Sequence, residues 1–172
     1  MKYFIADLHI DDPNILTYEH RPFENLTQMS ASIIYNWTQT VGNDDEVYLL
    51  GDIGNINVLS YLTGKITIVC GNHDNYELIK TLYPNITVSK HPIMIDDVAW
   101  LSHEPIGYMA PEVPYINIHG HTHKFSYGLV GKNWQEGNRY FCCSVEQINY
   151  KPISMDEISK KIEYKPVPQL VM

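Results

Sequence analysis

The chain is poor in cysteine and contains no long hydrophobic run, and each shortage excludes a class of protein. Only three of its 172 residues are cysteines, Cys70, Cys142 and the adjacent Cys143. An odd number with two neighbours is a poor disulfide framework, so we expect a protein of the reducing cytosol. No apolar run approaches the roughly 18 residues of a membrane helix, which argues against association with a membrane. The N-terminus, MKYFIADLHIDD, is typical of a first strand and not of a signal peptide.

Basic residues are also scarce. Lysine and arginine number 12 against 20 aspartates and glutamates, so the formal net charge is −8. Because phosphate backbones attract basic surfaces, this balance disfavours extended nucleic-acid binding. The acidic residues are scattered along the chain, and cations are their more natural partners. With 44% hydrophobic residues, the chain is long enough to bury the core of a single domain spanning residues 1–172.

Strand and helix patterns alternate along the chain and predict an α/β fold. Strands are expected at 2–6, 46–50, 65–70, 92–96, 98–102, 114–118 and 139–145. Helices are expected at 23–41, 55–62, 75–83 and 155–163. Asp96-Asp97 has the character of a hairpin turn, and Ser154 with Glu157 forms a capping-box pattern.

Polar residues that can bind metals follow the predicted strands. They are Asp7, His9, Asp52, Asn72, His73, His103, His121 and His123. In open α/β sheets, ligands bind at the carboxyl ends of the strands. Each residue alone has a structural explanation, such as a helix cap, a turn or a hydrogen-bonded core histidine. Their shared position at strand ends favours a common site.

The donor atoms of this set indicate the type of metal. Imidazole, carboxylate and amide groups without a thiolate suit Mn, Fe, Zn, Co or Ni. Seven of these nitrogen and oxygen groups would be too many for one ion, but they suffice for two ions that share a carboxylate. The stretch NIHGHTHKF, residues 117–125, adds His119 to His121 and His123 at alternate positions. Alone, this stretch is compatible with either a histidine-rich solvated turn or a metal site.

The order of these motifs resembles a known family. Asp7-x-His9, Gly51-Asp52, Gly71-Asn72-His73-Asp74, His103 and Gly120-His121-Thr122-His123 resemble the five motifs of the calcineurin-like metallophosphoesterases. Further segments resemble a group of small bacterial and phage phosphoesterases, so the likeness covers nearly the whole chain. The resemblance implies a β-sandwich of two mixed sheets flanked by helices, with the metal site at the C-terminal ends of strands.

The resemblance also implies a role for each site residue. Asp7, His9 and His123 would bind a first metal, Asn72, His103 and His121 a second, and Asp52 would bridge the two. His73 would protonate the leaving group. Asp74 would either orient His73 or cap the helix at 75–83. His119 would support the site by a hydrogen bond to a ligand or a carbonyl.

The expected activity is hydrolysis of small or flexible phosphodiesters through a metal-bridging hydroxide, with two divalent ions and manganese favoured. The alternatives are a phosphomonoesterase and a non-catalytic scaffold with the same fold. Asp11, Asp12 and Glu104 depart from the pattern of the group and add negative charge, which favours a monoanionic diester over a dianionic monoester.

Two further residues are candidates for substrate contact. Arg21 could bind phosphate through its guanidinium, but a solvated arginine before a helix is the favoured interpretation. Asn55 replaces an aspartate of the protein serine/threonine phosphatases, which argues against that branch. The sequence does not define the oligomeric state.

Overall fold

A computed structural model describes residues 1–109, 115–124 and 139–162 of the chain. Its strands are β1 (Lys2–Ile5), β2 (Glu46–Leu49), β3 (Lys65–Val69), β4 (Thr87–Ser89), β5 (Ile93–Ile95), β6 (Ala99–Ser102), β7 (Ile116–His119), β8 (Tyr140–Cys142) and β9 (Ile153–Ser154). Its helices are α1 (Ile15–Tyr18), α2 (Leu26–Thr40), α3 (Tyr76–Leu82) and α4 (Met155–Lys161), with the 3₁₀ helices η1 (Ile56–Tyr61) and η3 (Val145–Gln147).

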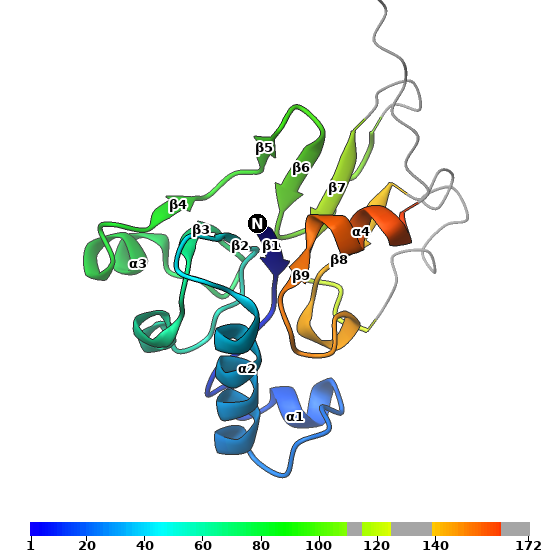
Figure 1. The fold of residues 1–172 in the computed structure, drawn as a ribbon. Coiled ribbons are helices and arrows are strands. Elements are labelled where there is room, and N and C mark those ends of the chain that lie inside the picture. The colour runs from blue at the N-terminus through cyan, green and yellow to red at the C-terminus, as the bar shows by residue number, and fades with distance from the viewer. Residues whose placement is uncertain (110–114, 125–138, 163–172) are drawn as a thin grey trace, which may run out of the picture.

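The strands form two mixed sheets. The five-stranded sheet has the order β4-β3-β2-β1-β9, with β9 antiparallel to β1 and the other pairs parallel. The four-stranded sheet has the order β5-β6-β7-β8, with β5 antiparallel and the rest parallel. Helices flank the sheets, α3 beside β4 and α4 beside β9 (Figure 1). This arrangement confirms the expectation of an α/β chain with two mixed sheets flanked by helices.

Parallel pairing brings several strand ends to one edge. In the first sheet Ile5 pairs with Leu49, and Leu49 pairs with Ile68. The two sheets meet at Ala6, whose N–H donates to the carbonyl of Cys143 at 2.9 Å and whose carbonyl accepts from Val145 at 3.1 Å. Because Asp7 follows Ala6 directly, this junction fixes the backbone from which the candidate site begins.

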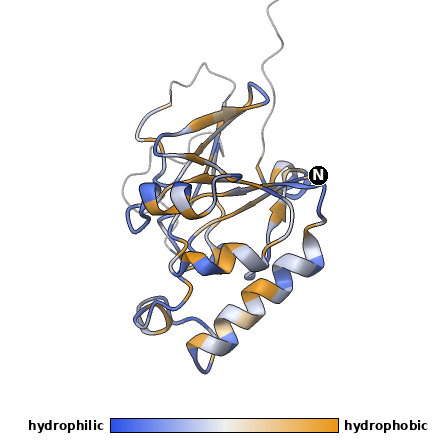
Figure 2. Cartoon of the chain, turned by 90° about the vertical axis from the view of Figure 1, so that its left-hand side faces the viewer, coloured by the Kyte–Doolittle hydropathy of each residue, from blue (hydrophilic) through white to orange (hydrophobic). Residues whose placement is uncertain are grey.

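Helix α2 shows how the sequence pattern builds the core. Asn25 caps its N-terminus by accepting from the N–H of Gln28. Met29, Ile33 and Trp37, four residues apart, are fully buried on one face. The indole N–H of Trp37 donates to the carbonyl of Thr63 at 2.9 Å, so the buried ring keeps a polar partner. Figure 2 shows hydrophobic residues concentrated on strands and along parts of the helices, with several hydrophilic loops.

Local patterns predicted most of the longer elements correctly. Asp96 and Asp97 turn the β5–β6 hairpin with φ values of 51° and 52°, the left-handed backbone that a type I′ turn requires. The Ser154–Glu157 capping box is present at the start of α4. The segment at 55–62 is a 3₁₀ helix, and β7 extends to His119. The short elements α1, β4, β9 and η3 were not predicted, because two to four residues are too few to show a period.

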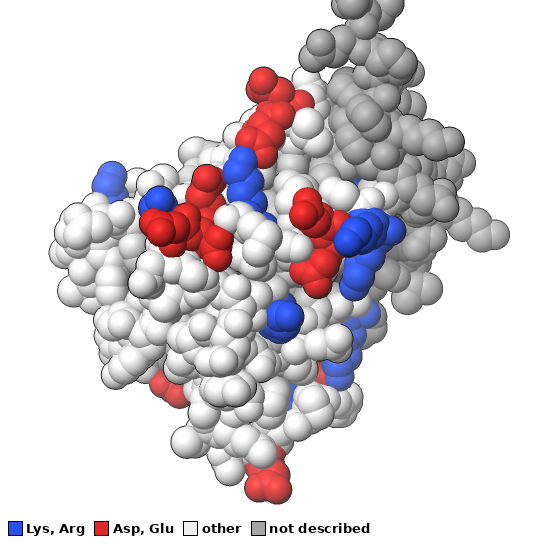
Figure 3. Space-filling model, viewed as in Figure 1, with Lys and Arg blue, Asp and Glu red and all other residues white. Residues whose placement is uncertain are grey.

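Within the described residues, no helix is long and apolar enough to cross a membrane. On the face shown in Figure 3, acidic and basic side chains lie interspersed, and wide areas carry neither. The described part of this face therefore offers no continuous basic track for a phosphate backbone.

Candidate metal centre

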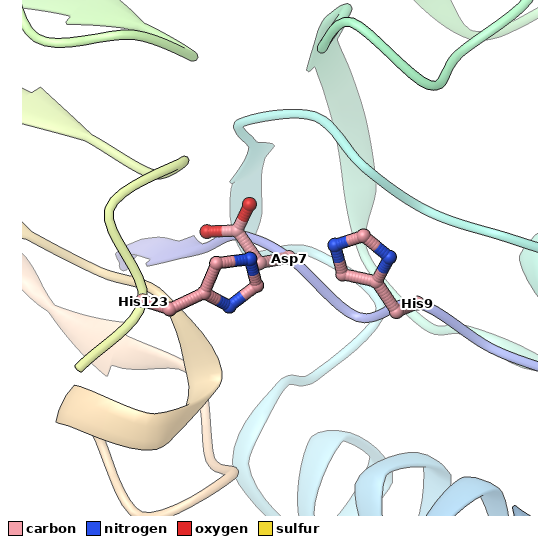
Figure 4. A group of neighbouring side chains, drawn as sticks. All are labelled: Asp7, His9 and His123. Atoms are coloured by element: carbon pink, nitrogen blue, oxygen red, sulfur yellow. The ribbon is translucent and has the colours of Figure 1, made fainter. Parts of the chain in front are cut away.

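Two groups of ligand-type side chains converge at the strand ends. In the first, the ligand atoms of Asp7, His9 and His123 lie within 4.8 Å of one another. Figure 4 shows these three side chains around a common space, with Asp7 and His9 on the segment after β1 and His123 on the loop after β7. This is the set that the sequence assigned to a first metal.

The second group contains Asp52, His103 and His121, whose ligand atoms also lie within 4.8 Å of one another. The amide oxygen Oδ1 of Asn72 joins them, 2.9 Å from Nε2 of His103 and 3.1 Å from Nδ1 of His121. All the residues assigned to a second metal are therefore together, although β2, β3, β6 and β7 each contribute a separate loop.

Asp52 lies between the two groups. Its Oδ2 is 3.6 Å from Nε2 of His9 and 3.4 Å from Nε2 of His103. Its Oδ1 accepts the backbone N–H of His73 at 3.0 Å. One carboxylate oxygen thus faces an imidazole from each group, which is the position a bridging ligand requires.

At several site residues the backbone adopts a left-handed conformation that residues other than glycine rarely take. Positive φ values occur at Asp7 (59°), His9 (48°), Asp52 (53°), His121 (67°) and His123 (48°). Such conformations each cost about 1–3 kcal/mol and cluster at functional sites, where the surrounding structure imposes them. Five of the seven predicted ligands are therefore held in a strained geometry.

The motif glycines allow the ligand loops to approach one another. A Cβ on Gly51, whose φ is 85°, would lie 2.6 Å from Nδ1 of His103. A Cβ on Gly71 would lie 2.2 Å from Oδ1 of Asp52. Any larger residue at Gly71 would displace the carboxylate that lies between the two groups. This contact explains in physical terms why glycine precedes the Asn-His pair.

Outer partners fix the orientation of three imidazoles. Nδ1 of His9 lies 3.3 Å from Oδ2 of Asp12, Nδ1 of His103 bonds the carbonyl of Leu50 at 2.9 Å, and Nδ1 of His123 lies 3.2 Å from Oε1 of Glu146. Such partners orient metal-binding histidines so that the other ring nitrogen faces the metal. Asp12, expected only to add charge near the substrate, therefore supports His9.

The donor set and its unmet hydrogen-bonding needs fit a bound cation. Nε2 of His9 is buried and has no hydrogen-bond partner among the described residues. An unpaired buried nitrogen costs about 1–3 kcal/mol, and a metal ion would satisfy it. The nearby donors are imidazole nitrogens, carboxylates and one amide oxygen, which match Mn, Fe, Zn, Co or Ni.

Burial and mutual charge shift the acid–base properties of the centre. Burial raises the pKa of Asp7 to about 6, against the opposing effects of His123 and His103. Burial also lowers the pKa of His9 to about 4. Burial alone would raise the pKa of Asp52, but the hydrogen bond and charge of His103 outweigh it and bring the pKa to about 2. Asp52 therefore remains ionised between the two groups at neutral pH.

His119 belongs to neither ligand group. It is buried at the end of β7, and its Nδ1 bonds the carbonyl of Gly120 at 2.8 Å. Burial lowers its pKa to about 4, so its ring is neutral at pH 7. This is the hydrogen bond to a carbonyl that was expected of His119, and a supporting role for it stays a prediction.

His73 and Asp74 have different surroundings. His73 is exposed, and its ring centre lies 5.6 Å from that of His9, at the edge of the first group. The carboxylate of Asp74 instead accepts three backbone N–H groups, from Asp52 at 2.8 Å, Ile53 at 3.0 Å and Gly71 at 2.8 Å. The predicted helix-cap role of Asp74 is wrong, because Asn75 caps α3 and the oxygens of Asp74 hold the motif loops together. An orienting role of Asp74 toward His73 stays a prediction.

Arg21 is also placed differently from either prediction. Its side chain is fully buried and donates to the carbonyls of Asp7 and Leu8 at 2.7 and 2.8 Å. It also pairs with Glu146, at 2.7 Å between Nη2 and Oε1. A guanidinium occupied by these partners cannot reach a phosphate. Arg21 instead ties the backbone of the Asp7–His9 segment to Glu146.

Glu146 was not identified from the sequence. It connects Arg21 to His123, and Oε2 is buried with no hydrogen-bond partner among the described residues. Burial alone would raise the pKa of Glu146, but the hydrogen bond from His123 and the charge of Arg21 outweigh it and lower the pKa. The available signal was an acidic residue directly after a predicted strand. Its arginine partner lies 125 positions away.

We expect Glu146→Gln to destabilise the metal-free protein by about 3–5 kcal/mol, because Arg21 would remain buried without its counter-charge. Urea unfolding measures this change as a lower urea concentration at the midpoint, while the slope of the unfolding free energy against urea concentration stays the same. Glu104→Gln, at an exposed position, is the matched control and should leave the midpoint unchanged. Equal midpoints for the two variants would show that the Arg21–Glu146 pair does not stabilise the fold.

Asn55 takes part in local structure. Its Oδ1 accepts from the N–H of Asn57 at the start of η1, and its Nδ2 donates to Oδ2 of Asp11 at 2.7 Å. The residue is exposed. Contact between Asn55 and a substrate stays a prediction.

Two sequence relatives match the chain over different extents. No protein-family model matches it. It is 33% identical over 172 residues to "Uncharacterized protein MJ1445" of Methanocaldococcus jannaschii, covering 94% of this chain and 90% of that protein. The chain therefore belongs to the same family as this archaeal protein. It is also 30% identical over 81 residues to the Gene 66 protein of Mycobacterium phage L5, covering 42% of this chain and 39% of the phage protein.

A solved structure has a similar fold. The protein of unknown function AQ665 from Aquifex aeolicus superposes with a TM-score of 0.69 at 27% identity, covering 94% of this chain and 99% of that one. The names of these relatives state no activity. The function of the chain must therefore be argued from its site.

Proposed function

We propose that the chain is a two-metal phosphoesterase of the calcineurin-like metallophosphoesterase type, acting in the cytosol on small or flexible phosphodiesters. The observation that supports this most strongly is the position of Asp52, whose Oδ2 faces His9 at 3.6 Å and His103 at 3.4 Å. A carboxylate between two sets of N/O donors is what a pair of metal ions would share.

In this proposal each residue of the site has a metal-binding, orienting or proton-donating role. Asp7, His9 and His123 would hold one ion, and Asn72, His103 and His121 the other. When bound, two divalent ions, manganese favoured, would supply charge neutralisation of the phosphate and activation of water. Asp12, Leu50 and Glu146 would orient the ligand imidazoles. The exposed imidazole of His73, next to His9, would donate a proton to the leaving oxygen.

Local negative charge supports a diester as the substrate. Asp12 lies beside His9, and the charge of Glu104 acts on His121, where it opposes the lowering of the His121 pKa by burial and by His103. A monoester carries close to two negative charges at neutral pH and a diester carries one, so these acids penalise the monoester more. The overall charge of −8 also penalises the monoester more than the diester.

The test is hydrolysis by protein loaded with Mn²⁺ at pH 7.5. We expect kcat/KM for bis(nitrophenyl) phosphate to exceed that for nitrophenyl phosphate by about tenfold or more, a difference of about 1.4 kcal/mol. Glu104→Gln should reduce the ratio. A higher value for the monoester would overturn the diester assignment in favour of a phosphomonoesterase. Two bound ions with no turnover of either ester would instead identify a non-catalytic scaffold.

A further inference from the structure

A cavity of about 430 Å³ opens beside His73. Its lining includes Cys70, Gly71, His73, Asn75, Tyr76 and Lys90. The volume lies within the range of about 300–1,000 Å³ that is usual for small-molecule sites. Three segments form it, namely the loop after β3, the start of α3 and the end of β4.

One end of this cavity adjoins the candidate metal centre. Gly71 lies so close to Asp52 that an added Cβ would come within 2.2 Å of its Oδ1. His73 donates its backbone N–H to the same oxygen, and its ring lies beside that of His9. A phosphate held by the two ligand groups would therefore have His73 and this cavity on one side. In the proposed reaction, that is the side from which the leaving group departs.

The other end of the cavity presents the ring of Tyr76 with the ammonium group of Lys90 over it, and Lys80, outside the lining, contacts the same tyrosine. Nζ of Lys90 lies 4.3 Å from the ring centre of Tyr76, and Nζ of Lys80 donates to the Tyr76 hydroxyl at 3.2 Å. Lys90 also pairs with the exposed Glu77 at 3.1 Å. The lining also contains Asp74 and Glu77, so Lys90 is its one cation among the described residues. The ring of Tyr76 supplies a surface for stacking, and the ammonium group of Lys90 supplies donors.

We propose that this cavity receives the leaving group of the substrate, and that Tyr76 and Lys90 select a leaving alcohol with a planar ring and hydrogen-bond acceptors. A nucleoside has this chemistry, and so does nitrophenol. The planar ring stacks on Tyr76 in place of the Lys90 ammonium, which turns to donate to an acceptor at the edge of the bound ring. This assignment rests on the proposed function, because it takes the phosphate to lie at the two ligand groups. It adds the class of leaving group that the enzyme accepts.

The kinetic test compares two diesters that share one leaving group. Bis(nitrophenyl) phosphate and methyl nitrophenyl phosphate both release nitrophenolate but differ in the group that remains. We expect Tyr76→Leu to raise KM about tenfold for both esters, since stacking on an aromatic side chain contributes about 1–3 kcal/mol. Tyr61→Leu, at a tyrosine that is 67% exposed on η1, should change neither. A loss confined to the bis ester would overturn the proposal, because the cavity would then hold the group that stays.

A binding measurement separates this proposal from the proposed function. Adenosine is titrated into the metal-free protein while the side-chain NMR signals of Tyr76 and His73 are followed. We expect both signals to shift, and Lys90→Gln, at an exposed position, to weaken adenosine binding several-fold. If the protein bound adenosine but hydrolysed no ester, the proposed function would be wrong. The cavity would still be a binding site for a planar ring. Absence of adenosine binding together with an unchanged KM in Tyr76→Leu would reject the cavity assignment alone.

Discussion

Replacing Asp52 by asparagine should reduce the metal content from two ions per chain to at most one and abolish turnover. The carboxylate faces His9 and His103 from between the two ligand groups, and it stays ionised because its pKa is about 2. An asparagine has the same shape but lacks the charge and one of the two oxygen donors that a shared ligand supplies. Elemental analysis after dialysis against saturating Mn²⁺, with a parallel hydrolysis assay, measures both effects.

Asp44→Asn is the matched control for this experiment. The Asp44 side chain is fully exposed on a loop before β2, so its replacement tests the same chemical change away from the site. The control should keep two ions and full activity. At most one ion per chain in the unaltered protein would contradict the two-metal centre directly. Two ions in Asp52→Asn would show that the carboxylate does not bridge them.

The convergence of the candidate ligands could be predicted from sequence because each residue follows a recognisable strand. Asp7 comes two residues after Ile5, and Asp52 three after Leu49, where parallel pairing brings the strand ends together. The hairpin turn at 96–97 was predictable for a similar reason, since its signal is contained in adjacent residues. Local patterns thus located both the edge of the sheet and the side chains that gather there.

The supporting interactions could not be predicted, because they join distant parts of the chain. Arg21 and Glu146 are 125 positions apart, and Asp74 bonds a backbone N–H that is 22 positions away. An isolated arginine before a helix or an aspartate before a helical pattern gives no sign of such partners. The left-handed backbone of His9 and His123 is likewise imposed by neighbouring segments, against the preference of the residues themselves.

His73→Ala should keep both metal ions and lose roughly 10²–10⁴-fold in rate on esters with poor leaving groups. The side chain of His73 belongs to neither ligand group, and its contact with Asp52 is made by the backbone N–H, which alanine retains. Metal content should therefore stay at two ions, while the proton donor next to the leaving oxygen is lost. The measurement is kcat for methyl phenyl phosphate alongside elemental analysis of the same sample.

The dependence on leaving group distinguishes proton donation from a structural role of His73. Nitrophenolate leaves as an anion and needs no proton, so the deficit of His73→Ala should shrink markedly on bis(nitrophenyl) phosphate. His91→Ala, which removes an exposed histidine after β4, should behave as the unaltered protein on both esters. If His73→Ala were equally slow on the two esters with both ions retained, the imidazole would act on binding or positioning of the phosphate and would not be the proton donor.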